Sequence, residues 1–195
     1  MTEQDLFVQA LNSTIQGTWT GSGVDVFPTP SGPQKTDYTE TTTFGEVFQT
    51  INPGGPKNRQ VLDCVHYSTN LVNAQTKKPM HQETGYWLID AAQTKFIKAI
   101  AIPRGISILA GGTYHIFSGS SRDPIFVLNA SANVGSPTFG ISSDHFLSSV
   151  SPTTRFNITI ELTGDRMSYK EDSILKIDEQ YLHHTDEATL SKVSL

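Results

Sequence analysis

One tryptophan set among three glycines is the feature that most restricts the fold of this chain. The segment Gly17-Thr-Trp19-Thr-Gly21-Ser-Gly23 places Trp19 and the three glycines at odd positions. In a β-strand, residues two apart point to the same face, so one large indole lies among positions without side chains. Glycine weakens a strand unless the chain coils sharply or another layer approaches closely. A tryptophan flanked by such gaps suits the narrow end of a β-barrel.

Alternating hydrophobicity predicts short two-faced strands along most of the chain. Residues 156–162 are apolar at every even position, and Gly164-Asp165 then indicates a turn into a second strand of the same kind. Similar strands are expected at residues 17–27, 36–50, 59–70, 80–90, 94–102, 106–118, 124–132, 138–150 and 183–193. Residues 3–15 instead carry apolar side chains at helical spacing. These patterns predict an all-β fold with a short N-terminal helix, and periodicity alone leaves a barrel and a sandwich equally open.

The charge balance and cysteine content exclude several kinds of partner. The 195 residues include 14 Lys and Arg against 19 Asp and Glu, so no basic cluster predicts binding to nucleic acid or to a membrane surface. Cys64 is the sole cysteine, which excludes an internal disulfide and a multi-cysteine metal site. The N-terminus lacks the basic start and apolar stretch of a signal peptide. We therefore expect a cytoplasmic protein, with residues 1–15 as a helix or lid and residues 16–195 as one β domain.

The glycine and tryptophan segment resembles the GxWxGxG signature of the nitrobindins, which are heme-binding relatives of the fatty-acid-binding-protein and lipocalin barrels. Residues 79–86, Pro-Met-His-Gln-Glu-Thr-Gly-Tyr, are similar to the Pro-Met-His-x-Glu-Ser-Gly-aromatic block of that family. Weaker matches lie at residues 27–29 and 188–190, and all of them follow the family's order over residues 16–193. The resemblance implies an antiparallel, calycin-like β-barrel of about ten strands.

The same resemblance implies a cofactor and an activity. Nitrobindins hold a ferric heme b near one open end of the barrel, through a histidine on the last strand. Members bind nitric oxide, and isomerisation of peroxynitrite to nitrate is attributed to some of them. For this chain we therefore expect a heme or another small hydrophobic ligand, in a monomer or a homodimer.

The iron ligand is left open between two histidines. The family histidine stands three residues before the alanine that corresponds to Ala188, and this chain has Thr185 there. In an unbroken strand His183 shares the face of Thr185 and His184 faces the other way, whereas a one-residue bulge reverses that choice. Both histidines are therefore candidate axial ligands.

Three further residues are candidates for contacts with heme. The resemblance places Met80 and His81 on the distal side, where the imidazole is expected to donate to a bound oxyanion or to hold water. Thr29 is expected to hydrogen-bond the heme edge or a propionate. The departure at Thr185 supports an alternative function, a lipocalin-like or fatty-acid-binding-like carrier of a small hydrophobic ligand that has lost heme.

Overall fold

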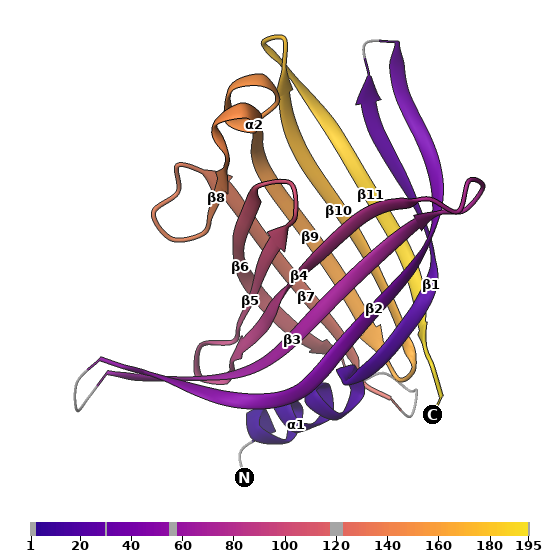
Figure 1. Ribbon diagram of the computed structural model, residues 1–195. Helices are drawn as coiled ribbons and strands as arrows, with labels where there is room; N and C mark the ends of the chain where they lie inside the picture. The colour runs from indigo at the N-terminus through magenta and orange to yellow at the C-terminus, as the bar shows by residue number, and fades with distance from the viewer. Residues whose placement is uncertain (1–2, 30, 55–57, 118–122, 195) are drawn as a thin grey trace.

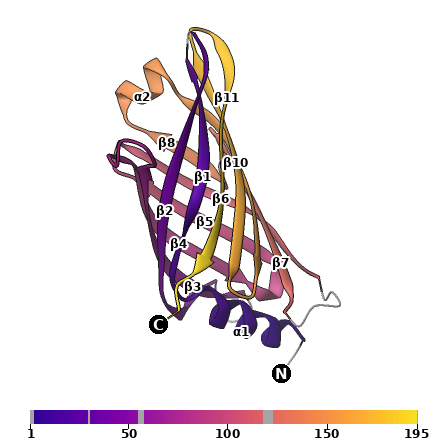
Figure 2. The same ribbon diagram turned by 90° about the vertical axis from the view of Figure 1, so that its right-hand side faces the viewer.

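Strands wrap into a closed barrel, and one helix lies under one end of it (Figures 1 and 2). The computed structural model describes residues 3–29, 31–54, 58–117 and 123–194. Its helices are α1 (Glu3–Ile15), the short 3-10 helix η1 (Ala91–Gln93) and α2 (His145–Val150). Its strands are β1 (Gly17–Thr29), β2 (Gly32–Pro53), β3 (Arg59–Asn73), β4 (Pro79–Asp90), β5 (Lys95–Ile102), β6 (Ile106–Phe117), β7 (Ile125–Val134), β8 (Gly140–Ser143), β9 (Thr153–Thr163), β10 (Arg166–Ile177) and β11 (Gln180–Lys192).

The strand order settles the choice between barrel and sandwich. Around the barrel it runs β1-β11-β10-β9-β7-β8-β6-β5-β4-β3-β2, and β2 pairs with β1 to close the circle. Neighbouring strands are antiparallel, except that β7 and the short β8 are parallel. The predicted barrel with a short N-terminal helix is thus confirmed, and in the described residues it has eleven strands.

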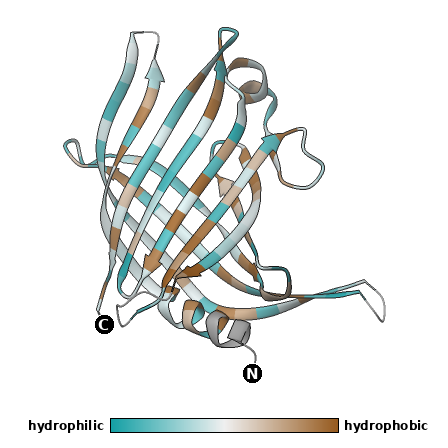
Figure 3. Ribbon diagram, turned by 180° about the vertical axis from the view of Figure 1, so that it is seen from behind, coloured by the Kyte–Doolittle hydropathy of each residue, from teal (hydrophilic) through white to brown (hydrophobic). Residues whose placement is uncertain are grey.

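Side-chain burial follows the alternation that the sequence predicted. On β9 the apolar residues Phe156, Ile158, Ile160 and Leu162 are all buried, and the residues between them are more exposed. Figure 3 shows the same alternation as hydrophobic and hydrophilic bands along the strands. The apolar face of β9 therefore points into the barrel.

Helix α1 and Trp19 close one end of the barrel. Leu11 and Ile15 of the helix are buried in the same core as Trp19, which is completely buried. The indole nitrogen of Trp19 donates a 2.8 Å hydrogen bond to the carbonyl of Ile15. Lys192 at the end of β11 donates to the carbonyl of Thr14 at 2.7 Å, so a cation lies at the C-terminal end of α1 where the helix dipole favours it.

Two glycines of the motif make room for neighbouring atoms. A Cβ on Gly21 would overlap the carbonyl oxygen of Thr189 on the adjacent strand. A Cβ on Gly23 would overlap the ring of Tyr38, which crosses this position inside the barrel. The close approach expected from the glycines is therefore made by the neighbouring strand and by a tyrosine ring, and not by a second layer.

One expected strand is wrong. Residues 138–150 were predicted to be extended, but they form the four-residue β8 followed by α2. Asp144 begins this helix, since its carboxylate accepts a 2.9 Å hydrogen bond from the amide of Leu147, as an N-cap residue does.

Among the described helices none is long and apolar enough to cross a membrane.

Candidate functional site

A cavity of about 340 Å³ lies inside the barrel, toward the end where α2 is found. Leu147 of α2 and Arg104 from the β5–β6 turn line it near the rim. Trp19 and α1 close the opposite end. The barrel therefore offers a binding site that is entered from the α2 end.

The cavity has one apolar wall and one charged wall. Strands β5, β6 and β9 supply the apolar wall, which includes Ile100, Ile102, Ile108, Phe156, Ile158 and Ile160. The acidic side chains come from the other half of the barrel, from β1, β2, β4, β10 and β11: Asp25, Glu40, Glu83, Glu171 and Asp186. An apolar ligand with polar edges suits such a lining better than a purely apolar one does.

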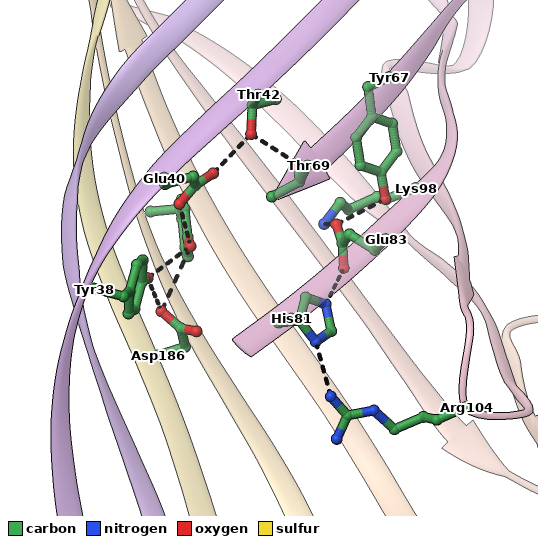
Figure 4. A network of polar contacts seen from close by, with 11 residues as sticks. Tyr38, Glu40, Thr42, Tyr67, Thr69, His81, Glu83, Lys98, Arg104 and Asp186 are labelled. Atoms are coloured by element: carbon green, nitrogen blue, oxygen red, sulfur yellow. Dashed lines mark hydrogen bonds and ion pairs between the residues drawn. The ribbon is translucent and has the colours of Figure 1, made fainter. Parts of the chain in front are cut away.

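A chain of hydrogen bonds joins carboxylates and tyrosines within the charged wall (Figure 4). Tyr38 donates to Asp186, and its hydroxyl lies 2.9 Å from that of Tyr169. Tyr169 in turn donates to Glu40 at 2.8 Å, and Thr42 donates to the other oxygen of Glu40 at 2.7 Å. Buried polar atoms cost free energy unless they are bonded in this way.

A second group surrounds Glu83 on β4 (Figure 4). Lys98 and Tyr67 each donate to one oxygen of Glu83 at 2.9 Å, and His81 lies 3.5 Å from the other oxygen. Lys98 is only 5% exposed, so its charge is neutralised inside the protein by this carboxylate. Arg104 lies 3.5 Å from the remaining ring nitrogen of His81 and extends the group toward the rim.

The pKa values of the carboxyls in the charged wall are shifted in opposite directions. Burial opposes the ionisation of Glu83, but Lys98 and His81 hold its pKa well below the usual range. Burial raises the pKa of Glu171 to about 8, against the attraction of Lys98. Burial also raises the pKa of Glu40 to about 7 and that of Asp186 to about 6, despite the hydrogen bonds that both accept. The charged wall therefore holds protons near neutral pH.

These raised pKa values predict that the protein loses stability as the pH rises. A carboxyl with a higher pKa in the folded than in the unfolded state stabilises the fold below about pH 4.5, and this contribution is lost as the pH rises through 6 to 8. Replacing Glu171 by glutamine should flatten the dependence by roughly 1–3 kcal/mol, since one pKa unit corresponds to about 1.4 kcal/mol. Urea unfolding at pH 5.5 and 8.5 measures the effect.

The matched control for this prediction is Glu187→Gln on the same barrel wall, because the Glu187 side chain is 61% exposed. It should leave the dependence of the wild type unchanged. Parallel curves for Glu171→Gln and the wild type would contradict the prediction. Glu83 acts in the opposite sense, and its contribution is lost only when the pH falls below the ordinary carboxyl range.

The structure separates the two candidate histidines on β11. This strand pairs with β1 and β10 without a register shift, and Ala188 and Leu190 on its even face are buried. His184 shares that face and lines the cavity, whereas the face of His183 and Thr185 points outward. The His183 side chain is 68% exposed and contacts Asp172 on the outer surface, so it does not reach the cavity. An unbroken strand was expected to favour His183, because it shares the face of Thr185. The strand is unbroken, but this face points away from the cavity, so His183 cannot contact a ligand inside the barrel.

The other predicted contact residues fall in two places. Met80 and His81 both line the cavity. Thr29 lies at the β1–β2 turn, where its hydroxyl donates a 2.6 Å hydrogen bond to the carbonyl of Gly32, and it is not among the residues that line the cavity. The heme contact expected of Thr29 therefore has no support in its position.

Sequence reasoning missed most of the charged wall. Glu40, Lys98 and Glu171 look like ordinary exposed residues of two-faced strands, but they point inward. One signal was available in the sequence. Tyr38 and Glu40 are two residues apart, and in the hairpin of β1 and β2 they lie on the same face as Trp19.

Comparison with known proteins identifies the barrel. The family model described as "THAP4-like, heme-binding beta-barrel domain" matches residues 10–192. The chain belongs to this family. The resemblance to nitrobindins drawn from the glycine and tryptophan motif is thereby confirmed, and the match covers every strand of the THAP4-like barrel.

A solved structure supports the fold of the THAP4-like barrel. The crystal structure of Rv2717c from M. tuberculosis is similar with a TM-score of 0.68 and 21% sequence identity, covering 100% of this chain and 99% of that one. At this level of identity the likeness concerns the fold alone. A search among curated proteins found no match.

Proposed function

We propose that the barrel binds heme b with His184 as the axial ligand of the iron, and that the bound heme takes up nitric oxide or isomerises peroxynitrite to nitrate. The observation that carries this proposal is the inward position of His184 on the last strand, at the cavity of a heme-binding barrel family. A neutral imidazole is a common axial ligand of heme iron.

The residues around His184 fit such a cofactor. The isoleucines of the apolar wall and Met80 offer apolar contacts to a macrocycle. Phe27 packs edge-on against the His184 ring, with 5.1 Å between centroids, and so limits the orientations of that ring. Arg104 near the rim supplies a cation for a propionate.

His81 also lines the cavity but is less suited to bind a metal cation. Its Nε2 faces the carboxylate of Glu83, and a guanidinium nitrogen of Arg104 lies 3.5 Å from its Nδ1. A fixed cation beside the free nitrogen opposes the approach of a second cation. His184 has an aspartate beside it instead, which favours a bound cation.

The bound heme would supply the redox and ligand-binding chemistry, and the chain supplies orientation and electrostatics. His184 holds the iron. Arg104 places N–H donors near the rim of the cavity that can hydrogen-bond a small oxyanion, whereas the two ring nitrogens of His81 face Glu83 and Arg104. The acidic groups on the charged wall disfavour an extra buried carboxylate, so the carboxylates of a ligand, heme propionates included, belong near the rim beside Arg104.

Titration of the purified protein with hemin tests the proposal. We expect a Soret band that saturates at one equivalent, and nitric oxide should then shift the band. Stopped-flow decay of peroxynitrite, with nitrate as the measured product, tests the catalytic part. Native mass spectrometry of protein isolated from cells distinguishes the alternative function: a heme-mass adduct supports the proposal, and a lipid adduct on a protein that shows no Soret saturation contradicts it.

A further inference from the structure

Two histidine–aspartate pairs lie next to each other on β11, one inside the barrel and one outside. Inside, Nε2 of His184 lies 2.6 Å from a carboxylate oxygen of Asp25 on β1. Outside, Nδ1 of His183 lies 2.8 Å from a carboxylate oxygen of Asp172 on β10. The inner pair is more enclosed, with 18% of the Asp25 side chain exposed against 33% for Asp172.

The strand register places Asp25 beside His184. In the ladder between β1 and β11, Asp25 pairs with Asp186, and His184 is the next residue on the same inward face. Diagonal neighbours of this kind lie within side-chain reach. Asp186 itself accepts the hydrogen bond of Tyr38, so Asp25 is the carboxylate that contacts the imidazole.

A carboxylate on one ring nitrogen determines what the other nitrogen can do. An ionised carboxylate can only accept, so a neutral imidazole beside Asp25 carries its proton on Nε2 and its lone pair on Nδ1, the nitrogen that is left for a metal. Such an acceptor also makes the imidazole a stronger electron donor to a metal. Hydrogen bonding to the axial ligand is one of the means by which a protein shifts the ferric–ferrous equilibrium of heme.

We propose that Asp25 is the positioning residue of the heme ligand: its carboxylate fixes the His184 imidazole in one tautomer and orientation and favours ferric over ferrous iron. This inference rests on the proposed function. The aspartate lies within the first strand, two residues after the glycine and tryptophan motif, and no part of the resemblance assigns it a role.

The decisive experiment compares hemin-loaded wild type, Asp25→Asn and Asp172→Asn. In Asp25→Asn the ferric–ferrous equilibrium should shift at least tenfold toward ferrous iron, which is a rise of about 59 mV in midpoint potential. The iron–histidine stretching frequency of the ferrous protein should fall in the same variant. Asp172→Asn should match the wild type in both measurements, since its histidine lies outside the barrel.

The outcomes separate this inference from the proposed function. If Asp25→Asn binds one equivalent of hemin but keeps the wild-type potential and stretching frequency, the role of Asp25 is overturned and heme binding stands. If the wild type binds no hemin, both fall. Should Asp25→Asn fail to fold, the nitrogen chemical shifts of His184 in the wild-type apoprotein decide: a proton on Nε2 supports the inference, and a proton on Nδ1 overturns it.

Discussion

Replacing His184 by alanine should lower the affinity for hemin by about 100-fold or more, because it removes the iron–imidazole bond. Loss of a partner that only orients a metal ligand typically costs about 10- to 100-fold, so loss of the ligand itself should exceed that range. The Soret band of any hemin that still binds should move, since the axial ligand is missing. Absorbance titration of the variant under the wild-type conditions provides the measurement.

The matched control is His183→Ala, one residue away on the same strand. Its side chain is 68% exposed and contacts Asp172 outside the barrel, so this variant should titrate as the wild type does. Equal losses in the two variants would indicate disruption of β11 and not loss of a ligand. If His184→Ala binds hemin as tightly as the wild type does, the assignment of His184 is contradicted. His81→Ala would then be the variant to compare.

Replacing Trp19 by alanine should destabilise the fold by about 3–5 kcal/mol, the usual range for emptying a buried aromatic site. The side chain is fully buried between the barrel and α1, and the variant would also remove its hydrogen bond to Ile15. Urea unfolding followed by circular dichroism should show a lower midpoint. A loss below about 1 kcal/mol would contradict the role of Trp19 in closing the barrel end.

The second buried tryptophan provides a control for the hydrogen bond. Within the described structure, Nε1 of Trp87 is buried and has no hydrogen-bond partner, and its ring packs edge-on against Phe44 and Phe96. Trp19→Phe leaves the carbonyl of Ile15 without its donor, whereas Trp87→Phe breaks no such bond. Trp19→Phe should therefore cost about 1–2 kcal/mol more than Trp87→Phe.

The sequence predicted the barrel better than its contents. Alternation on β9 and β10 is a local signal that predicted two-faced strands, and the resemblance carried by the glycines around Trp19 led to the correct architecture. The error at residues 138–150 is also local, because Asp144 begins a helix in a segment whose spacing of Phe139 and Ile141 is typical of a strand. An aspartate before His145 is a helix-start signal, and in this segment it outweighs the alternation.

The charged wall depends on contacts that the sequence does not display. Tyr169 bonds to Glu40 across 129 positions, and Tyr38 bonds to Asp186 across 148. Without the partner, an acidic residue on a strand is expected to face solvent. The inward face of β11, by contrast, can be predicted from the sequence. Ala188 and Leu190 lie on the same face as His184, and apolar residues mark the core face of a strand.

Because α1 and Trp19 shut the base of the barrel, the cavity is closed at that end. Anything that enters past α2 has to depart along the path by which it arrived. For an occupant that fills the entrance, exchange is sequential and departure precedes replacement. An occupant seated near the entrance would thus set the rate at which a smaller molecule beneath it escapes, whatever that molecule's own affinity.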